Sequence, residues 1–401
     1  MSAALLIFAA TYLVIALGRA PGLRLDRTGA ALLGASLMVA AGVLTPGQAW
    51  SAIDAGTLVL LLGMMILVAH LRLAGFFGLV ARWAGAHAHR PALLLIAVVA
   101  MAGLFSAFLV NDTVCVMLAP LVAEIVLEMK RKVEPYLLAL AMASNAGSVA
   151  TITGNPQNIV IGSVSHIPYT EFAAALVPVA LVSLAVVAGA VLLFYRAEFR
   201  EPRRLEAPPQ EPVLHRWLLI KALTATLGAV IAFFAGVPPA EAAIVAGSLL
   251  LLTRRLKPQR IFVEVDWPLL LMFAGLFVVV RGLEQAAFTP AVLAAVRGLQ
   301  LDRPAVLALV SAMLSNLVSN VPAVLLLKPF VPGLADPQRA WLVLAMASTL
   351  AGNFTIAGSV ANLIVVERAR RSGVTISFWR HFRLGAPVTV LTILIGVWML
   401  G

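Results

Sequence analysis

Long runs of apolar residues, separated by short polar stretches, recur along the whole chain. A helix needs about 20 residues to cross the roughly 30 Å hydrocarbon core of a bilayer, and many of these runs approach that length. The pattern therefore predicts an all-α integral membrane protein. We expect about ten transmembrane helices, at residues 3–19, 28–45, 55–71, 136–164, 170–195, 216–236, 238–253, 266–281, 339–366 and 383–400.

Two further apolar segments, 92–129 and 304–330, each begin and end on one side of the membrane in this arrangement. Neither has a polar loop at its tip, and this favours a re-entrant helical hairpin over two full crossings. The chain is therefore expected to contain an inner hairpin in its first half and an outer hairpin in its second half.

Composition supports a membrane location. The chain is 62% hydrophobic and 12% charged, whereas soluble domains are about half apolar and about a quarter charged. Residues 1–20 lack a basic leading region and a clear cleavage site, so we interpret them as a span and not as a signal peptide. The single cysteine, Cys115, excludes an intrachain disulfide and is interpreted as a buried packing residue.

The basic residues lie in the short loops between spans, and this distribution indicates the orientation. With the N-terminus outside, all but five of the 29 basic residues fall on the cytoplasmic side, as the positive-inside rule requires. The net charge of +11 is thereby explained without a nucleic-acid partner. We predict a multi-pass protein of the cell inner membrane. The five outer basic residues are Arg281, Arg297, Arg303, Lys328 and Arg339.

The two halves of the chain are expected to be inverted repeats. Residues 1–195 and 216–401 each hold five spans and one hairpin, joined by a cytoplasmic linker at 196–215. Because each half has an odd number of spans, the second half is expected to have the inverted orientation in the membrane. Three collinear pairs support duplication: Asp54 and Gly63 with Asp266 and Gly275; Ser106-x4-Asn111-x8-Pro120 with Ser315-x4-Asn320-x8-Pro329; and 141–160 with 345–364, identical at eight of twenty positions.

Four polar clusters interrupt the apolar runs, and they form two pairs of repeats. Two lie at the hairpin tips, and two lie inside the spans 136–164 and 339–366. Gly154-Asn155-Pro156 should break its helix. Irregular backbone at membrane depth is tolerated only where protein or a water-filled cavity surrounds it, and paired interrupted helices in two halves indicate a transport site.

These clusters supply the candidate substrate- or ion-binding residues. Amide and hydroxyl oxygens with free carbonyls suit sodium, and free N–H groups suit an anion or an oxygen-rich solute. We expect Asn111, Asn158, Asn320 and Asn362 to line one central site. The full candidate set is Ser106, Asn111, Asp112, Thr113, Ser144, Asn145, Thr153, Gly154, Asn155, Asn158, Ser315, Ser319, Asn320, Asn353, Thr355, Gly358, Ser359 and Asn362.

Asp112 is the one acid that we place deep in the membrane. Its carboxyl could carry a proton or help to hold a cation; the alternative is that it caps a half-helix starting at Thr113. Asp54 and Asp266 each open a span and are interpreted as helix caps. Gly63 and Gly275 are interpreted as close-packing positions.

At these clusters the chain resembles the ion transporter superfamily, which includes arsenite-efflux permeases, citrate and dicarboxylate transporters, and sodium/proton antiporters. Asn111-Asp112 with the run to Pro120, and Ser315-Asn316 with Asn320-Val321-Pro322, resemble the arsenite-permease pattern. The segment 352–362 resembles the citrate and dicarboxylate branch. The resemblance implies a homodimer, a scaffold domain, and a transport domain that moves as an elevator.

The hairpin tips differ from those of the dicarboxylate branch, which carries Ser-Asn-Thr at both tips. Here the tips read Val110-Asn111-Asp112 and Ser319-Asn320-Val321. The difference favours an arsenite-type or proton-coupled transporter over a sodium-coupled dicarboxylate carrier. We therefore expect a secondary active transporter of a small oxyanion or its neutral acid, either arsenite-type or a di- or tricarboxylate, with sodium or a proton as coupling ion.

Three alternatives remain at this stage. A sodium/proton antiporter would use Asp112 without an anionic substrate. A passive channel fits Asn-rich broken sites less well than a binding site does. An intramembrane hydrolase needs a Ser–His or Ser–Lys pair, or two carboxylates, at one depth, and no cluster offers either. No phosphate-binding G-x4-G-K-[ST] motif occurs. The sequence therefore indicates neither an enzyme nor a metal or organic cofactor.

Overall fold

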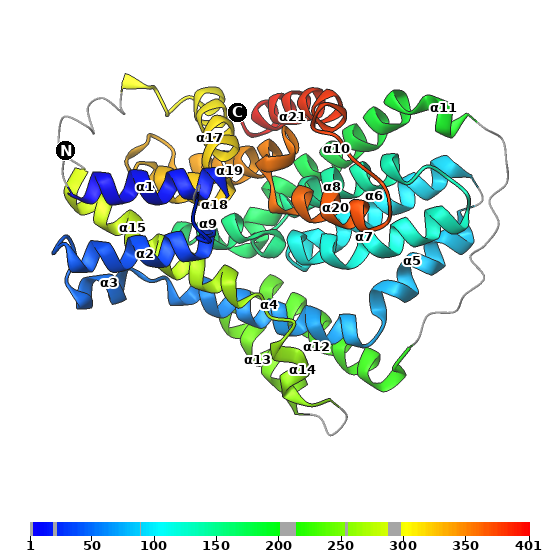
Figure 1. Ribbon diagram of the computed structural model, residues 1–401, viewed down its shortest axis with the longest axis horizontal. Coiled ribbons are helices and arrows are strands. Elements are labelled where there is room, and N and C mark those ends of the chain that lie inside the picture. Colours follow the sequence, from blue (N-terminus) through cyan, green and yellow to red (C-terminus); the bar gives the residue numbers. More distant parts are fainter. Residues whose placement is uncertain (1–2, 19–21, 89, 201–213, 253–255, 288–297) are drawn as a thin grey trace.

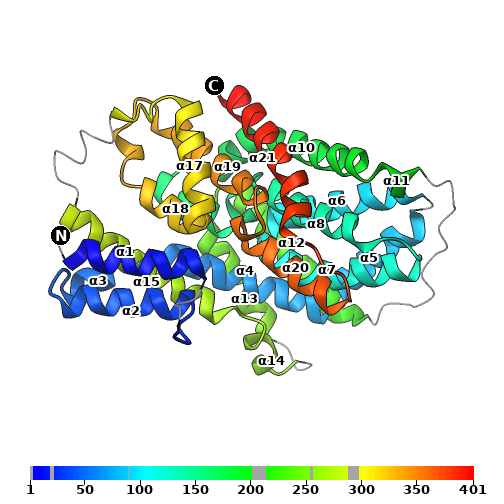
Figure 2. The same cartoon turned by 45° about the horizontal axis from the view of Figure 1, so that its top comes forward.

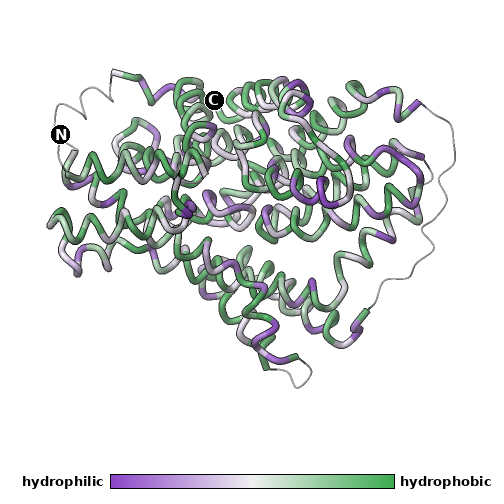
Figure 3. Tube along the Cα trace, in the orientation of Figure 1, coloured by the Kyte–Doolittle hydropathy of each residue, from purple (hydrophilic) through white to green (hydrophobic). Residues whose placement is uncertain are grey.

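The computed structural model describes residues 3–18, 22–88, 90–200, 214–252, 256–287 and 298–401. These residues form helices and short 3-10 turns, with no β-strand among them. Most of the predicted linker at 196–215 lies outside the described residues. Apolar positions dominate the helices, and hydrophilic positions gather at helix ends and near the centre (Figure 3). The all-α class is confirmed.

Six of the described helices are long and apolar enough to cross a membrane. They are α4 (Ala55–Leu73), α6 (Pro91–Phe108), α10 (Tyr169–Phe194), α12 (Arg216–Phe234), α15 (Trp267–Ala287) and α21 (Phe378–Leu400). Four shorter apolar helices are α1 (Ala3–Leu17), α2 (Arg27–Ala40), α13 (Pro239–Leu251) and α17 (Pro304–Val318).

One group of helices is built from two similar sets. In the first set, α1 and α2 pack against α15; in the second, α12 and α13 pack against α4. The short helices α3 (Pro46–Ala52) and α14 (Pro258–Phe262) flank these sets and lie at the left and at the bottom of Figure 1. Asp54 and Asp266 accept hydrogen bonds from the N–H groups of Thr57 and Leu269, which confirms both as caps of α4 and α15.

Gly63 and Gly275 each allow close contact between the backbones of two helices of this group. A Cβ atom at Gly63 would lie 2.6 Å from the carbonyl carbon of Ala243 on α13. A Cβ atom at Gly275 would lie 2.7 Å from the carbonyl carbon of Ala31 on α2. In a membrane, small residues at such contacts let helix backbones approach without a hydrophobic driving force. The interpretation of both glycines as close-packing positions is confirmed.

Gly63→Ala and Gly275→Ala should each lower the free energy of unfolding by about 1–3 kcal/mol, the usual cost of overpacking, because the obstructing atoms are backbone. Gly228→Ala on α12 is the matched control, since nothing lies within 4 Å of its built Cβ. Thermal unfolding of the purified variants in detergent measures the difference. Equal melting temperatures for Gly63→Ala and Gly228→Ala would contradict the expectation.

A second group of helices contains the hairpins and the interrupted helices. It lies at the right and top of Figure 1, and Figure 2 shows the same group after a rotation about the horizontal axis. Its members, besides α6, α10, α17 and α21, are α5 (Phe76–His87), α7 (Asn111–Glu128), α8 (Val133–Ser148), α9 (Pro156–Ser165), α11 (Arg196–Phe199), α18 (Asn320–Leu327), α19 (Pro337–Leu350) and α20 (Val360–Arg371).

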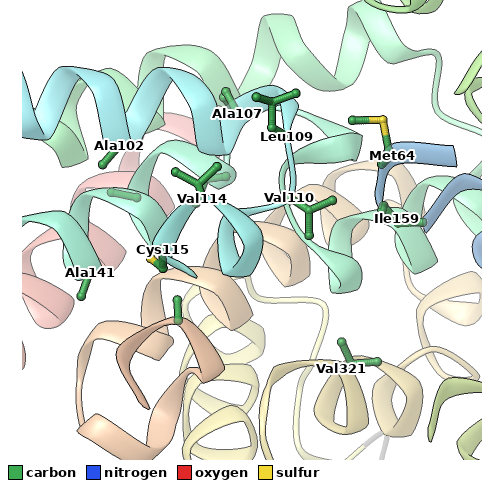
Figure 4. Packing of buried hydrophobic residues seen from close by; sticks show 14 of the residues in the cluster. Met64, Ala102, Ala107, Leu109, Val110, Val114, Cys115, Ala141, Ile159 and Val321 are labelled. Carbon is green, nitrogen blue, oxygen red and sulfur yellow. The ribbon is translucent and has the colours of Figure 1, made fainter. Parts of the chain in front are cut away.

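Each predicted hairpin is a pair of helices that meet at a tight tip. Val110 joins α6 to α7 with φ 55°, and Ser319 joins α17 to α18 with φ 77°. Positive φ is uncommon for residues other than glycine, and such backbone is concentrated at functional sites. Figure 4 shows Val110 above Val321 of the opposite hairpin, with Val114 and Cys115 of α7 in the surrounding apolar core. Cys115 is fully buried there.

The spans predicted at 136–164 and 339–366 are each broken in the middle. The first consists of α8, a 3-10 turn at Ile152–Gly154, and α9. Pro156 occupies the first turn of α9, and the Asn155 side chain caps it by accepting from the Asn158 N–H. The second consists of α19, turns at Ala351–Asn353 and Ile356–Gly358, and α20. The expected helix breaks are therefore present in both halves of the chain.

Candidate functional site

The two hairpin tips and the two helix breaks meet at a cavity of about 40 Å³, which we call the central cavity. The hairpin tips contribute Asn111, Asp112, Ser319 and Asn320, and the residues beside the breaks contribute Gln157 and Ser359. Helices α1, α2 and α15 of the other group close the remaining side. Helices α9 and α18, which contribute to this lining, lie side by side in Figure 1 and pack against each other.

Asn145, at the end of α8, is the hub of the cluster behind this cavity. Its Oδ1 accepts from Asn111 Nδ2 at 3.0 Å and from Ser359 Oγ at 3.0 Å. Its Nδ2 donates to Asn353 Oδ1 at 2.9 Å and to Asn362 Oδ1 at 3.3 Å. Asn145 is fully buried. One side chain thus joins the first hairpin tip to the helix break of the second half.

Thr349, at the end of α19, occupies the corresponding place in the second half. Its Oγ1 accepts from Asn155 Nδ2 at 3.2 Å and from Gln157 Nε2 at 3.1 Å. Asn320, with its amide oriented to suit its neighbours, donates to the Ser348 carbonyl at 3.1 Å and accepts from Gln157 at 3.3 Å. Each half therefore binds the broken helix of the other.

Asn158 and Asn362 bind the broken backbone and do not line the central cavity. Asn158 Nδ2 donates to the carbonyls of Ser148 and Thr151, and Asn362 Nδ2 donates to those of Gly352 and Thr355. These carbonyls are freed by the ends of α8 and α19. Both asparagines therefore hold an irregular backbone in shape, because an unpaired carbonyl at this depth is costly.

The other candidate residues surround the same cluster. Ser106 Oγ lies 2.9 Å from Ser144 Oγ, Thr153 Oγ1 lies 2.8 Å from the Tyr169 hydroxyl, and Thr355 Oγ1 donates to Asn316 Oδ1 at 3.2 Å. Gly154 and Gly358 stand beside the Ser148 and Gly352 carbonyls.

Some buried polar atoms in the cluster have no hydrogen-bond partner among the described residues. They are Oδ1 of Asn111, a residue that is 3% exposed, Asn158 Oδ1 and Ser315 Oγ. An unsatisfied buried polar group costs about 1–3 kcal/mol and calls for a role. Asn111 is among the residues that line the central cavity, so its buried oxygen lies beside that space.

Asp112 lies in the first turn of α7, which begins at Asn111. The alternative that it caps a helix beginning at Thr113 is wrong: Val110 is the N-cap, and no side chain caps α7. The Asp112 carboxylate instead faces the Ala361 N–H in the first turn of α20. Asp112 therefore lies at the contact between α7 and α20.

Asp112 also borders a second cavity of about 170 Å³, the inner cavity. Its lining includes Arg72 at the end of α4, and Glu264 and Asp266 before α15. Arg72 pairs with Glu264. All three belong to the ends that the charge distribution assigns to the cytoplasm. Asp112 therefore stands between the central cavity and the cytoplasmic side.

A third cavity, of about 580 Å³, lies at the opposite ends of these helices and is called the outer cavity. Thr57 and Ser163 line it together with His166, Tyr169 and the loop between α12 and α13. It separates α4, α12 and α13 from α9 and α10. All three cavities thus lie between the two helix groups.

Several residues of the cluster were not among the sequence candidates. Gln157 and Asn316 stand inside polar motifs and could have been chosen from them. Thr349 also stands inside a polar cluster, and it aligns with Asn145 in the predicted repeat. Arg27 had been assigned to a cytoplasmic loop, but its side chain lines the central cavity. No local sequence pattern distinguishes Arg27 from the other loop arginines.

The arrangement can bind a small polar solute but shows no metal centre. Among the described residues no group of three or more His, Cys, Asp or Glu side chains could hold a metal ion. The central cavity offers amide and hydroxyl groups as donors and acceptors, one carboxyl group and one guanidinium group.

Comparison with known sequences identifies transport proteins. The family model described as "Citrate transporter" matches residues 6–351. A transporter of Mycobacterium tuberculosis, itself uncharacterised, is 31% identical over 98% of this chain and 96% of its own length. The silicon efflux transporter LSI3 of rice is 30% identical over 95% of this chain and 93% of its own. A Dictyostelium discoideum protein named as an arsB transporter is 25% identical over 94% and 87%.

A solved structure has a similar fold. The YdaH transporter of Alcanivorax borkumensis matches 99% of this chain and 95% of its own, with a TM-score of 0.57 and 17% identity. The relatives are named for transport, in agreement with the prediction that this chain is not an enzyme.

Proposed function

Because this chain belongs to the citrate transporter family, we propose that it is a proton-coupled secondary transporter of a small hydroxylated acid of the arsenite type. Membership of a transport family makes the chain a membrane transporter of small molecules. The identity of the solute, the coupling ion and the mechanism are our proposal.

The lining of the central cavity is the observation that carries this proposal. About 40 Å³ of space is bordered by amides and hydroxyls, one carboxyl group and one guanidinium group. A neutral acid such as arsenous acid carries hydroxyl groups that donate to amide and hydroxyl oxygens of this lining and accept from its amide N–H groups. Paired donors and acceptors of this kind favour a compact polyhydroxylated solute, since each buried polar group needs a partner.

A di- or tricarboxylate suits this lining less well. Two or three carboxylates would have to be desolvated next to Asp112, with Arg27 as the one cation among the described residues that line the cavity. Like charges at close range disfavour such binding. The names of two relatives, for silicon efflux and for arsB, also support a small hydroxylated acid. A di- or tricarboxylate stays the competing substrate class because the family is described by citrate.

Asp112 is proposed as the coupling residue. It borders the central cavity on one side and the inner cavity on the other, so a proton could reach it from the cytoplasmic side without passing the solute. A carboxyl group in a membrane interior is a common proton carrier. Sodium coupling is the alternative, with hairpin-tip oxygens as ligands.

We further propose that 1–195 and 216–401 are inverted repeats that build an elevator. Helices α2 and α4 correspond in length and order to α13 and α15, and α6–α9 correspond to α17–α20. The reciprocal bonds of Asn145 and Thr349 support the same pairing. The group containing α1, α2, α4, α12, α13 and α15 would be the scaffold, and the hairpin group would move. Homodimerisation through the scaffold completes the proposal.

The purified protein in proteoliposomes tests this function. Solute flux should follow an imposed proton gradient and not a sodium gradient, with arsenite, silicic acid, citrate, succinate, sulfate and phosphate as probes. Asp112→Asn should reduce proton-driven flux at least about 100-fold, the scale on which positioned proton-transfer groups act, while leaving solute exchange without a gradient.

Three results would contradict parts of this proposal. Citrate flux driven by sodium and preserved in Asp112→Asn would move the assignment to the dicarboxylate branch. Sodium moving against protons with no solute would indicate an antiporter. Flux that dissipates a gradient without saturation would indicate a passive channel.

A further inference from the structure

Arg27 is a charged residue that lines the central cavity. The proposed function assigns proton coupling to Asp112 and leaves Arg27 without a role in it. It is the first residue of α2, and its side chain is half-buried. It lines the cavity together with Asp112, Gln157 and Asn320. Its helix belongs to the scaffold group, whereas those three residues belong to the hairpin group.

Three arginines near the cytoplasmic ends of helices form ion pairs in which Arg27 has no counterpart. Arg72 pairs with Glu264, Arg82 with Glu124 and Glu128, and Arg131 with Glu198. Among the residues that the structure describes, no hydrogen bond or ion pair is formed by the Arg27 side chain. A half-buried guanidinium group without a partner is unfavourable, so its position indicates a partner in another state of the protein.

The charged groups around Asp112 identify that partner. Arg27 lines the central cavity together with Asp112, and Arg72, Glu264 and Asp266 line the inner cavity together with it. Glu264 neutralises Arg72, and Asp266 caps α15 by accepting from the Leu269 N–H. Arg27 is therefore the unpaired cation among the described residues that line these two cavities with Asp112.

We propose that Arg27 is a stationary counter-charge that drives the proton off Asp112 when the hairpin group faces the cytoplasm. This inference rests on the proposed function for its coupling role. A fixed guanidinium favours the ionised carboxylate close to it. The proton then leaves through the inner cavity, and the resulting ion pair holds the empty hairpin group beside the scaffold. When the hairpin group moves away from Arg27, the carboxyl regains a proton on the other side.

Arg27 is thus a positioning residue for the proton and not a solute ligand. Under this assignment the positive charge at residue 27 is essential, whereas the shape of the side chain that carries it is not. It also requires that Asp112 respond to residue 27 in the absence of any solute, which separates the inference from the identity of the substrate.

Infrared spectroscopy of the full-length protein in liposomes tests the inference without a solute. The protonated carboxyl band that disappears in Asp112→Asn is followed against pH. In Arg27→Gln its midpoint should move up by about one pH unit, a tenfold gain in proton affinity, as removal of a nearby opposite charge predicts. Arg27→Lys should stay near the wild-type midpoint. Arg24→Gln, an exposed position in the same loop, should have no effect.

Each possible result either supports or overturns the inference about Arg27. A shift in Arg27→Gln with rescue in Arg27→Lys supports the inference even if arsenite is not transported, in which case only the proposed substrate fails. An unchanged midpoint in Arg27→Gln, equal shifts in both variants, or no titrating Asp112 band in the wild type overturns it. An altered KM for the solute with an unchanged midpoint would make Arg27 a solute ligand and overturn it too. Size-exclusion profiles confirm that the variants are folded.

Discussion

Replacing Asn145 by alanine is expected to abolish transport and to lower the free energy of unfolding by about 4 kcal/mol. The fully buried Asn145 amide accepts from Asn111 and Ser359 and donates to Asn353 and Asn362. The truncation removes the bonds of four partner atoms to residue 145, and each buried polar atom left unsatisfied costs about 1–3 kcal/mol. Water in the new space would recover part of that sum.

The position of Asn145 explains why function should be lost with stability. Its four bonds hold the tip residue Asn111 in register with Ser359, and both line the central cavity. Without Asn145 the first hairpin tip is no longer tied to the helix break of the second half. The measurements are chemical unfolding in detergent and solute flux in proteoliposomes.

Thr349→Val provides the matched control at the corresponding position. It removes one acceptor, but Asn155 retains its bonds to Ser148, so a loss of about 1–2 kcal/mol is expected. The role of Asn145 as the hub would be contradicted if the free energy of unfolding of Asn145→Ala lay within about 1 kcal/mol of the wild-type value. A smaller loss in Asn145→Ala than in Thr349→Val would contradict it too.

Gly154→Ala is expected to disrupt the first helix break, with flux reduced to background and about 3 kcal/mol of stability lost. A Cβ atom at Gly154 would lie 2.1 Å from the Ser148 carbonyl oxygen. That oxygen accepts from both Asn155 and Asn158. The added methyl group must therefore displace backbone and break two side-chain bonds together.

Gly358→Ala tests the same idea in the second half and should be milder. Its Cβ atom would lie 3.2 Å from the Gly352 carbonyl oxygen and 2.7 Å from Asn316 Oδ1, and a side-chain amide can move more easily than backbone. Equal losses of flux and melting temperature in the two variants would show that the close approach at Gly154 is not what sets the geometry of the break.

Much of the architecture could be predicted from the chain itself. Apolar run length predicted the helices, and Gly154-Asn155-Pro156 predicted a break because proline lacks a donor and glycine lacks a side chain. The caps at Asp54 and Asp266 followed from their place before apolar runs. The short helices α3, α5 and α14 were missed, since their 7, 12 and 5 residues are too short for a hydropathy signal of a span.

The candidate site could be predicted only in part. Polar clusters in apolar runs gave Asn111, Asn145, Asn320 and Ser359, because polar residues at that depth require partners. The same argument placed Asn158 and Asn362 at the cavity, whereas their amides bind the freed carbonyls of their own helix breaks. Residue type and spacing do not reveal which buried acceptor an amide will reach.

Sequence alone determined that lipid is the solvent of this chain, where its helices run and break, and which polar residues are withdrawn from water. Each follows from local rules: the length of apolar runs, the chemistry of glycine and proline, and the cost of an unpaired polar group. The tertiary structure alone decided that each half binds the broken helix of the other, that Asp112 borders two cavities, and that Arg27 of the other helix group lines one of them. Those relations join residues far apart in the chain, and packing between whole helices, which no local pattern encodes, brings them together.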